Sequence, residues 1–209
     1  IASITNGLGL HVEELDIGGG YPVPYTTKQK LPSPDRFAAS ICSSLKKEAK
    51  NAGMPLPHLY LEPGRSVAGP AGITLYTVGP VKDIPGVRSY VSVDGGLSDN
   101  PRPALYEAEY EAVIASNPAP RGRLRKYRVC GRHCETDTLI PEIALPRPKP
   151  GDVMAVFSTG AYNYSMSGNY NMFPRPAVVL VNKGKAEFIV ERESREDLFK
   201  KHVIPKRLK

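Results

Sequence analysis

The chain has 209 residues, of which 41% are hydrophobic, and it carries a formal net charge of +7 at pH 7. This size allows a substantial core in one large domain or two small ones, and we expect a soluble globular protein. The basic residues are scattered among acidic ones without a recognition helix or stacking platform, which argues against a nucleic-acid-binding protein. No apolar stretch approaches the roughly 20 residues that cross a bilayer, so no membrane span is expected.

Residues 1–70 are predicted to contain a strand, a helix and a second strand, the unit of a parallel sheet. The first strand, at 15–17, runs into a glycine loop. Ser33 is placed to cap a helix that begins with proline and keeps helical apolar spacing to about Gly53. The second strand covers 59–62. Because parallel strands expect neighbours on both sides, we expect the rest of this domain to lie upstream.

After about residue 70 the sequence changes to short β-rich runs separated by Gly and Pro. These runs cover residues 73–78, 89–93, 127–129, 153–157, 177–181 and 186–190. Their lengths predict an antiparallel sandwich or barrel. We therefore place a domain boundary near residue 70, assign residues 71–209 to a second, all-β domain, and expect a short helix at about 194–201.

Three consecutive glycines, Gly18, Gly19 and Gly20, follow the first predicted strand. Without side chains, their backbone N–H groups can close around an anion such as a phosphate. A tight turn is the alternative explanation. The loop matches neither the GxxxxGK[ST] nor the GxGxxG pattern of nucleotide-binding proteins.

The string Glu62-Pro63-Gly64-Arg65 ends the second strand with a carboxylate, a turn and a guanidinium. Carboxylates at strand ends mark active sites in α/β barrels. A surface Glu–Arg pair on a turn is the alternative.

Arg102 and Tyr106 lie four residues apart after the Asp-Gly-Gly turn at 94–96. A guanidinium and a phenol at this spacing can bind a carboxylate together. An exposed arginine next to a packed tyrosine is the alternative interpretation.

Cys130 and Cys134 flank a short segment that also contains His133 and is followed by Glu135. One histidine and no second ligand pair do not complete a tetrahedral zinc site, so no metal is expected. A thiol beside Arg, His and Glu side chains is better suited to acid catalysis. The three cysteines of the chain, an odd and low number, argue for a reducing compartment, and we expect a cytoplasmic protein.

Residues 160–171 are dense in Tyr, Ser and Asn, which predicts a hydrogen-bonding loop or a turn-rich hairpin. Over residues 11–181 the motifs follow one another in the order DIGGGY, EPGRS, DGG with RPALY, HCE, and GAYNYSMSGNYN with PRPAVVLV. This series resembles the fold-type III pyridoxal-phosphate enzymes, and among them the diaminopimelate decarboxylase family. Ornithine and arginine decarboxylases share GGG, EPGR and GAY, but RPALY and the SMSxNYN continuation are not expected in them.

The resemblance implies decarboxylation of meso-2,6-diaminopimelate to L-lysine and carbon dioxide, the last step of lysine biosynthesis. It implies that residues 1–70 are the closing part of a (β/α)8 TIM barrel that binds pyridoxal 5'-phosphate. Residues 71–209 are then an antiparallel β-sandwich or Greek-key barrel domain that contributes substrate-binding and dimer contacts.

The resemblance also assigns roles to residues. Cofactor contacts are implied for Gly18, Gly19, Gly20, Glu62, Gly64, Arg65 and Tyr162. Substrate contacts are implied for Arg65, Arg102, Tyr106, Glu135 and Tyr162. Glu62 would pair with the pyridine nitrogen and strengthen the ring as an electron sink. In a homodimer, Cys134 and Glu135 would act across the interface, the thiol as the acid that protonates the substrate carbon and the carboxylate at the distal ammonium.

The sequence departs from the family pattern in three places. The family string CESGD is replaced by CETDT at 134–138, which leaves the role of Asp137 open. Gly168 stands where a second serine is common. The Schiff-base lysine and the ring-stacking histidine belong to earlier strands, so residues 1–209 alone are expected to be inactive.

Three other interpretations of the sequence remain. The protein could decarboxylate another basic amino acid of the ornithine or arginine type. It could also be a non-catalytic homologue that regulates an active partner, although the retained Glu62, Arg65, Cys134 and Tyr162 argue against decay of the site. An unrelated β-rich binding module is the third.

Overall fold

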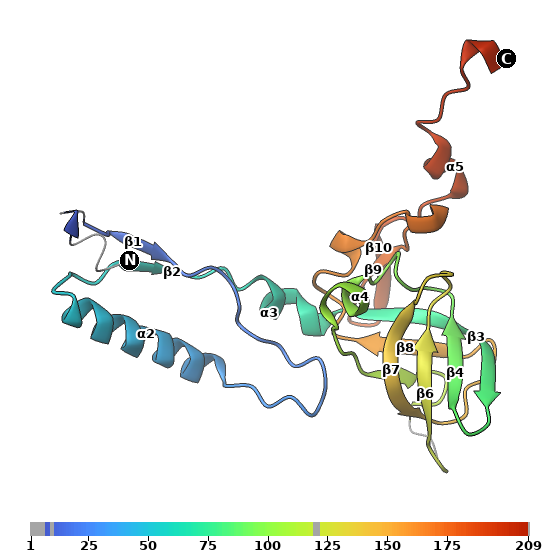
Figure 1. Ribbon diagram of the computed structural model, residues 1–209, viewed down its shortest axis with the longest axis horizontal. Helices are drawn as coiled ribbons and strands as arrows, with labels where there is room; N and C mark the ends of the chain where they lie inside the picture. The colour runs from blue at the N-terminus through green and yellow to red at the C-terminus, as the bar shows by residue number, and fades with distance from the viewer. Residues whose placement is uncertain (1–6, 9–10, 119–121, 209) are drawn as a thin grey trace. The chain divides into compact units, whose positions relative to one another are not determined.

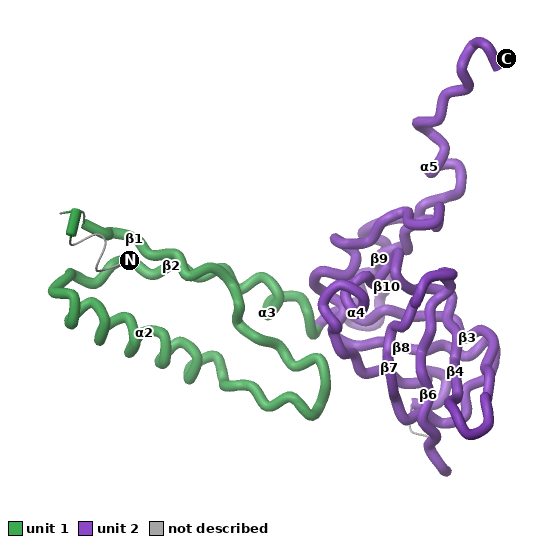
Figure 2. Tube along the Cα trace, viewed as in Figure 1, with its two compact units in different colours: residues 1–70 green, residues 71–209 purple. Residues whose placement is uncertain are grey.

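The computed structural model describes residues 7–8, 11–118 and 122–208. The chain divides into two compact units, Ile1–Pro70 and Ala71–Lys209, at the position where the texture of the sequence changes (Figure 2). Within the described ranges, no helix combines the length and the apolar character that crossing a membrane requires.

The first unit contains strand β1 (Glu14–Asp16), helix α2 (Pro34–Asn51), strand β2 (His58–Tyr60) and the short helix α3 (Gly64–Ala68). β1 pairs with β2 in parallel, as expected for a β-α-β unit. Helix α2 begins where predicted, because the Ser33 hydroxyl accepts a hydrogen bond of 3.3 Å from the Arg36 N–H and Pro34 occupies the first turn.

The second unit is built on a six-stranded sheet in the order β5-β8-β3-β4-β6-β7 (Figure 1). Its strands are β3 (Ile73–Ile84), β4 (Arg88–Val93), β5 (Ala112–Ile114), β6 (Arg125–Cys130), β7 (Thr138–Leu145) and β8 (Val153–Phe157). The edge strands β5 and β7 contact each other, so the sheet curls.

The sheet is mixed rather than antiparallel, which corrects the sequence-based prediction. β4 and β6 pair in parallel, whereas the other neighbours in the sheet are antiparallel. The chain leaves the end of β4 through helix α4 (Arg102–Tyr106) and strand β5 before it returns as β6. A crossover of this length brings the chain back to run in the same direction, which a tight hairpin cannot do.

The core of the second unit lies on this sheet. Its buried side chains include Tyr76, Val78, Val91, Val93, Ile114, Tyr127, Val129, Leu145, Met154 and Val156. Valines dominate, as expected for β-branched side chains packed on a pleated surface.

Beyond the sheet, β9 (Val178–Asn182) and β10 (Lys185–Val190) form a separate antiparallel hairpin, followed by helix α5 (Arg195–Phe199). Short 3-10 turns occur at Gly69–Ala71, Tyr164–Met166, Tyr170–Met172 and Lys206–Leu208. The predicted hairpin strands and terminal helix are confirmed with slightly different bounds. The strands β5 and β7 were not predicted.

Candidate active site

Strand direction brings three motifs of the second unit to one edge of its sheet. β8 and β4 are both antiparallel to β3, and β6 is parallel to β4, so β4, β6 and β8 run the same way. Their carboxyl ends therefore share an edge. The loops that follow are the DGG loop (residues 94–100), the HCE loop (residues 131–137) and the polar loop (residues 158–171).

The HCE loop is closed by hydrogen bonds at its base. The Gly131 N–H donates to the Asp137 carbonyl oxygen across 2.8 Å, and the Arg132 N–H donates to the Gly95 carbonyl oxygen across 2.9 Å. The Arg132 guanidinium lies over the ring of Phe173, 3.8 Å from its centroid. The loop is thus fixed to the DGG loop on one side and to the segment after the polar loop on the other.

Glu135 joins the HCE loop to the polar loop. Its carboxylate accepts hydrogen bonds from the Tyr170 hydroxyl at 2.8 Å and from the Asn171 side-chain amide at 3.1 Å. The backbone N–H of Glu135 itself, followed by the Tyr170 hydroxyl, lowers the pKa of this exposed carboxyl group. Glu135 is therefore held as an anion at the surface.

The two thiols of the HCE segment lie in different surroundings. Cys134 is exposed and hydrogen-bonds to Glu135, whereas Cys130 is partly buried at the end of β6. Burial raises the pKa of the Cys130 thiol. Cys134 is therefore the more accessible of the two thiols.

A purely structural pair would have an exposed Arg102 and a packed Tyr106, and the structure shows the opposite. Arg102 is buried, and its guanidinium donates a hydrogen bond of 2.8 Å to the Tyr110 hydroxyl. Tyr110 in turn lies 3.4 Å from the side-chain amide of Asn163, in the polar loop. Tyr106 is exposed. The arginine is therefore fixed in place, while the phenol faces outward.

Tyr162 lies in the polar loop, directly before Asn163. Its φ of 61° is in the left-handed region that residues other than glycine rarely adopt, and its side chain is half exposed. Such strain persists only where neighbouring structure enforces it, and it is common at functional sites. Nearby, a Cβ atom at Gly72 would lie 2.2 Å from the Gly160 Cα, so the start of β3 packs backbone against backbone with this loop.

In the first unit, the glycine loop and Glu62 pack against each other. The Glu62 N–H donates to the Gly18 carbonyl oxygen across 2.9 Å, and Gly18 has a φ of 70°. A Cβ atom at Gly19 would lie 2.8 Å from the Glu62 carbonyl oxygen, so no larger residue fits there. The backbone N–H groups of Gly19 and Gly20 donate to no other residue in the described ranges, which leaves them available to an anion.

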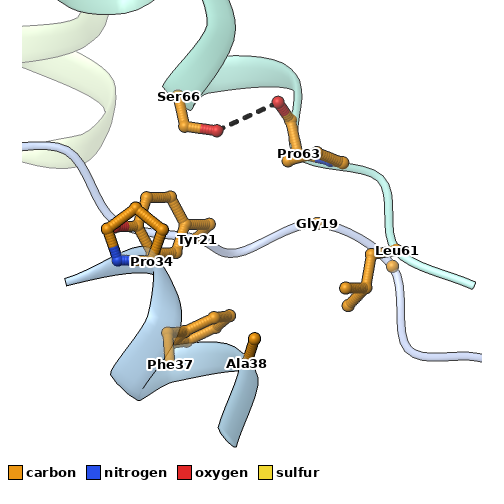
Figure 3. Close-up of a pocket in the computed structure, with 9 residues that line it drawn as sticks. Gly19, Tyr21, Pro34, Phe37, Ala38, Leu61, Pro63 and Ser66 are labelled. Carbon is orange, nitrogen blue, oxygen red and sulfur yellow. Dashed lines mark hydrogen bonds between the residues drawn. The ribbon is translucent and has the colours of Figure 1, made fainter. Parts of the chain in front are cut away.

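A pocket of about 400 Å³ opens beside this loop (Figure 3). It is lined by Gly18, Gly19, Tyr21, Pro34, Phe37, Ala38, Leu61, Pro63 and Ser66. The Ser66 hydroxyl donates a hydrogen bond of 3.1 Å to the Pro63 carbonyl oxygen and keeps the turn after β2 closed. The lining is mostly apolar, so a charged phosphate would be held by the backbone of the loop rather than by the pocket walls.

The candidate residues are divided between the two units. Those in the first are Gly18, Gly19, Gly20, Glu62, Gly64 and Arg65; those in the second are Arg102, Tyr106, Cys134, Glu135 and Tyr162. The Arg65 guanidinium lies over the Tyr25 ring, 5.7 Å from its centroid. Among the residues that the structure describes, no group of three His, Cys, Asp or Glu side chains is arranged to hold a metal ion.

The fold and these motif loops define a class of protein. A family model described as the C-terminal sheet domain of pyridoxal-dependent decarboxylases matches residues 23–160, and the chain belongs to that family. The diaminopimelate decarboxylase of Bacillus subtilis is 48% identical over 187 residues, which make up 89% of this chain and 42% of that protein. The diaminopimelate decarboxylase of a Synechocystis species is 45% identical over 98% of this chain and 44% of that protein.

A solved structure is also similar over nearly the whole chain. The diaminopimelate decarboxylase of M. jannaschii in co-complex with L-lysine matches with a TM-score of 0.86 and 32% sequence identity, over 99% of this chain and 46% of that one. The chain thus spans less than half the length of the relatives that it matches.

Four residues that sequence reasoning did not assign also belong to this edge of the sheet. They are His133, Asp137, Tyr170 and Asn171. Tyr170 and Asn171 lie in the polar string, but nothing in the sequence says which of its side chains turn toward Glu135. His133 and Asp137 are four residues apart, a spacing that suggests no contact outside a helix.

Proposed function

We propose that the protein is a pyridoxal-phosphate-dependent decarboxylase that converts meso-2,6-diaminopimelate to L-lysine and carbon dioxide, and that this chain is its C-terminal half. The observation that carries the proposal is the pair formed by the exposed Cys134 thiol and the anionic Glu135 beside it. A proton donor next to a carboxylate suits a substrate with an ammonium group. The names and the identities of the relatives support the choice of substrate.

The residues of the first unit fit the cofactor. The N–H groups of Gly19 and Gly20 would hold the phosphate, and the backbone of Gly64 and Arg65 would assist. In this structure the Gly64 N–H donates to the Glu62 carbonyl oxygen across 2.8 Å, so it would have to exchange that acceptor for the phosphate. When bound, pyridoxal phosphate supplies an electron sink for the electrons left by the loss of carbon dioxide. Glu62 would hold the proton on the ring nitrogen, because an adjacent carboxylate favours the charged form of a base. We propose that this unit is the closing part of a (β/α)8 barrel.

The residues of the second unit fit the substrate. Arg102 and Tyr106, with Arg65, would bind the carboxylate at the distal end of diaminopimelate. Tyr162 would contact both cofactor and substrate. In a homodimer, Cys134 and Glu135 of one subunit would serve the site of the other, where Cys134 Sγ gives its proton to the substrate carbon and Glu135 binds the distal ammonium.

Substrate profiling of the full-length protein tests the proposal. We expect turnover of meso-2,6-diaminopimelate with pyridoxal phosphate present, and little turnover of ornithine or arginine, whose distal ends carry no carboxylate for the arginines to bind. Preference for ornithine or arginine would favour the second candidate, a decarboxylase of another basic amino acid. Absence of turnover together with stable binding to an active decarboxylase would favour a regulatory homologue.

A further inference from the structure

We propose that His133 and Asp137 form a positioning pair that fixes Cys134 and Glu135 at the edge of the sheet. The inference rests on the proposed function, since that function makes Cys134 and Glu135 the groups whose position matters. The pair itself is defined by geometry alone: His133 Nδ1 and Asp137 Oδ2 lie 2.6 Å apart, and both side chains are buried.

The Asp137 carboxylate ties the HCE loop to the DGG loop. It accepts hydrogen bonds from the His133 N–H at 3.1 Å and from the Leu97 N–H at 3.0 Å, besides its contact with the His133 ring. One carboxylate oxygen therefore bonds to the HCE loop, and the other bonds to the DGG loop. Hydrogen bonds to a buried carboxylate are among the stronger ones in proteins because the acceptor is charged.

Two glycines make room for this carboxylate. A Cβ atom at Gly96 would lie 2.0 Å from an Asp137 oxygen, and one at Gly131 would lie 2.1 Å from the same oxygen. Both approaches are closer than any real contact, so an alanine at either position would displace the carboxylate. The sequence motif DGG, which precedes helix α4, is thus explained in part by the space that Asp137 needs.

The His133 ring links the pair to Glu135. It packs edge-on against Phe173, with centroids 5.1 Å apart, and tilted against Tyr170, with centroids 5.7 Å apart. The Tyr170 hydroxyl donates to Glu135. The orientation of the imidazole therefore supports the tyrosine that holds the carboxylate.

Cys134 and Glu135 lie between the two members of the pair. Only three residues separate His133 from Asp137, and the Asp137 N–H also donates to the Glu135 carbonyl oxygen across 2.6 Å. Because both ends of this short segment are fixed, its backbone has few available conformations, and the side chains of Cys134 and Glu135 are restricted in where they can point. Loss of the pair should free the loop and misplace the thiol, while the glycine loop of the first unit stays intact.

The experiment compares four variants of the full-length protein. His133→Asn keeps an N–H donor near the place of Nδ1, whereas His133→Gln and His133→Leu do not, and Asp137→Asn keeps the shape but loses the charge. His202→Leu is the matched control, because His202 also packs edge-on against a phenylalanine, at 5.3 Å, in another part of the chain. The readouts are kcat and KM for diaminopimelate, the alkylation rate of Cys134 by iodoacetamide, and the absorbance of bound pyridoxal phosphate.

We expect His133→Gln and Asp137→Asn to lower kcat/KM by about 10- to 100-fold, as for a reacting group displaced by up to about 1 Å. The alkylation rate of Cys134 should change relative to that of Cys42, which lies in helix α2 and serves as an internal reference. His133→Asn should keep most of the wild-type kcat/KM and a nearly wild-type alkylation rate of Cys134. In all these variants the absorbance of bound pyridoxal phosphate should match that of the wild type. If His133→Leu does not fold, the Asn and Gln variants still decide the question.

Two outcomes would overturn the proposal. One is wild-type kinetics and wild-type Cys134 alkylation in His133→Gln and Asp137→Asn. The other is an equal loss of kcat, cofactor binding and thermal stability in all His133 variants, Asn included, which would mean a merely structural role. Failure of the wild-type protein to act on diaminopimelate would refute the proposed function instead, and Cys134 alkylation would still report on the pair.

Discussion

The Tyr170 hydroxyl donates a hydrogen bond of 2.8 Å to the Glu135 carboxylate, and this bond connects two loops that are 35 residues apart in the chain. The bond also shifts the pKa of both groups. It is one of the causes that lower the pKa of Glu135, and it is the main cause that raises the pKa of Tyr170. Because the pKa of Glu135 is lowered, its ionised form persists to lower pH than that of an unassisted glutamate.

Replacement of Tyr170 by phenylalanine should raise the pKa of Glu135 toward its ordinary value. We expect a several-fold higher KM for diaminopimelate, with the acid-side loss of substrate binding shifted to higher pH and kcat changed less. Steady-state kinetics across the acidic range measure both effects. Tyr164→Phe, in the same loop, is the control and should leave the pH profile in place.

A second prediction concerns the buried Tyr76 and Asp99. The Tyr76 hydroxyl donates a hydrogen bond of 2.5 Å to Asp99, whose pKa is raised chiefly by burial. Tyr76→Phe removes the donor and leaves a buried carboxyl group with one partner fewer. The expected loss is roughly 1–3 kcal/mol in the free energy of unfolding. Denaturant titration measures it, and Tyr90→Phe, on the neighbouring strand, should cost much less.

A third prediction follows from the raised pKa of Tyr76, which burial and then Asp99 lift well above 10. Above pH 10 an unfolded tyrosine releases its proton, whereas folded Tyr76 keeps it, so the unfolded state binds fewer protons. Stability should therefore fall as the pH rises past 10, by at most about 1.4 kcal/mol per pH unit from this group. In Tyr76→Phe the fall should be shallower. An equal slope in both proteins would refute the assignment.

The fourth prediction tests the glycine loop. Gly19→Ala would place a Cβ atom 2.8 Å from the Glu62 carbonyl oxygen, so the loop must shift. Titration of the full-length protein with pyridoxal phosphate, followed by absorbance, should show weaker binding. Gly7→Ala is the control, because a Cβ atom at Gly7 would meet no atom of the described residues within 4 Å. Unchanged affinity in Gly19→Ala would contradict the phosphate assignment.

Local signals in the sequence predicted the elements whose causes are local. Helix α2 could be located because Ser33 and Pro34 mark its start and because apolar residues recur every four positions from Phe37 to Ala49. Strand β5 could not, since Ala112–Ile114 is too short for any periodicity to show. The parallel pairing of β4 with β6 depends on contacts between distant segments, which no local pattern encodes.

The same distinction applies to the candidate site. The resemblance to a known family supplied Glu62, Arg102, Cys134 and Glu135 as candidates. It left Asp137 open, because the family string CESGD is altered there. Only the folded chain brings that carboxylate against the N–H groups of His133 and Leu97, the second of which is 40 residues away from Asp137 in the chain.

The close fit of the Asp137 carboxylate between Gly96 and Gly131 restricts the substitutions that these positions accept. Three positions from two loops share one small volume, so a change at any of them alters what the other two can be. An engineered side chain at either glycine should therefore be tolerated only together with a smaller residue at position 137.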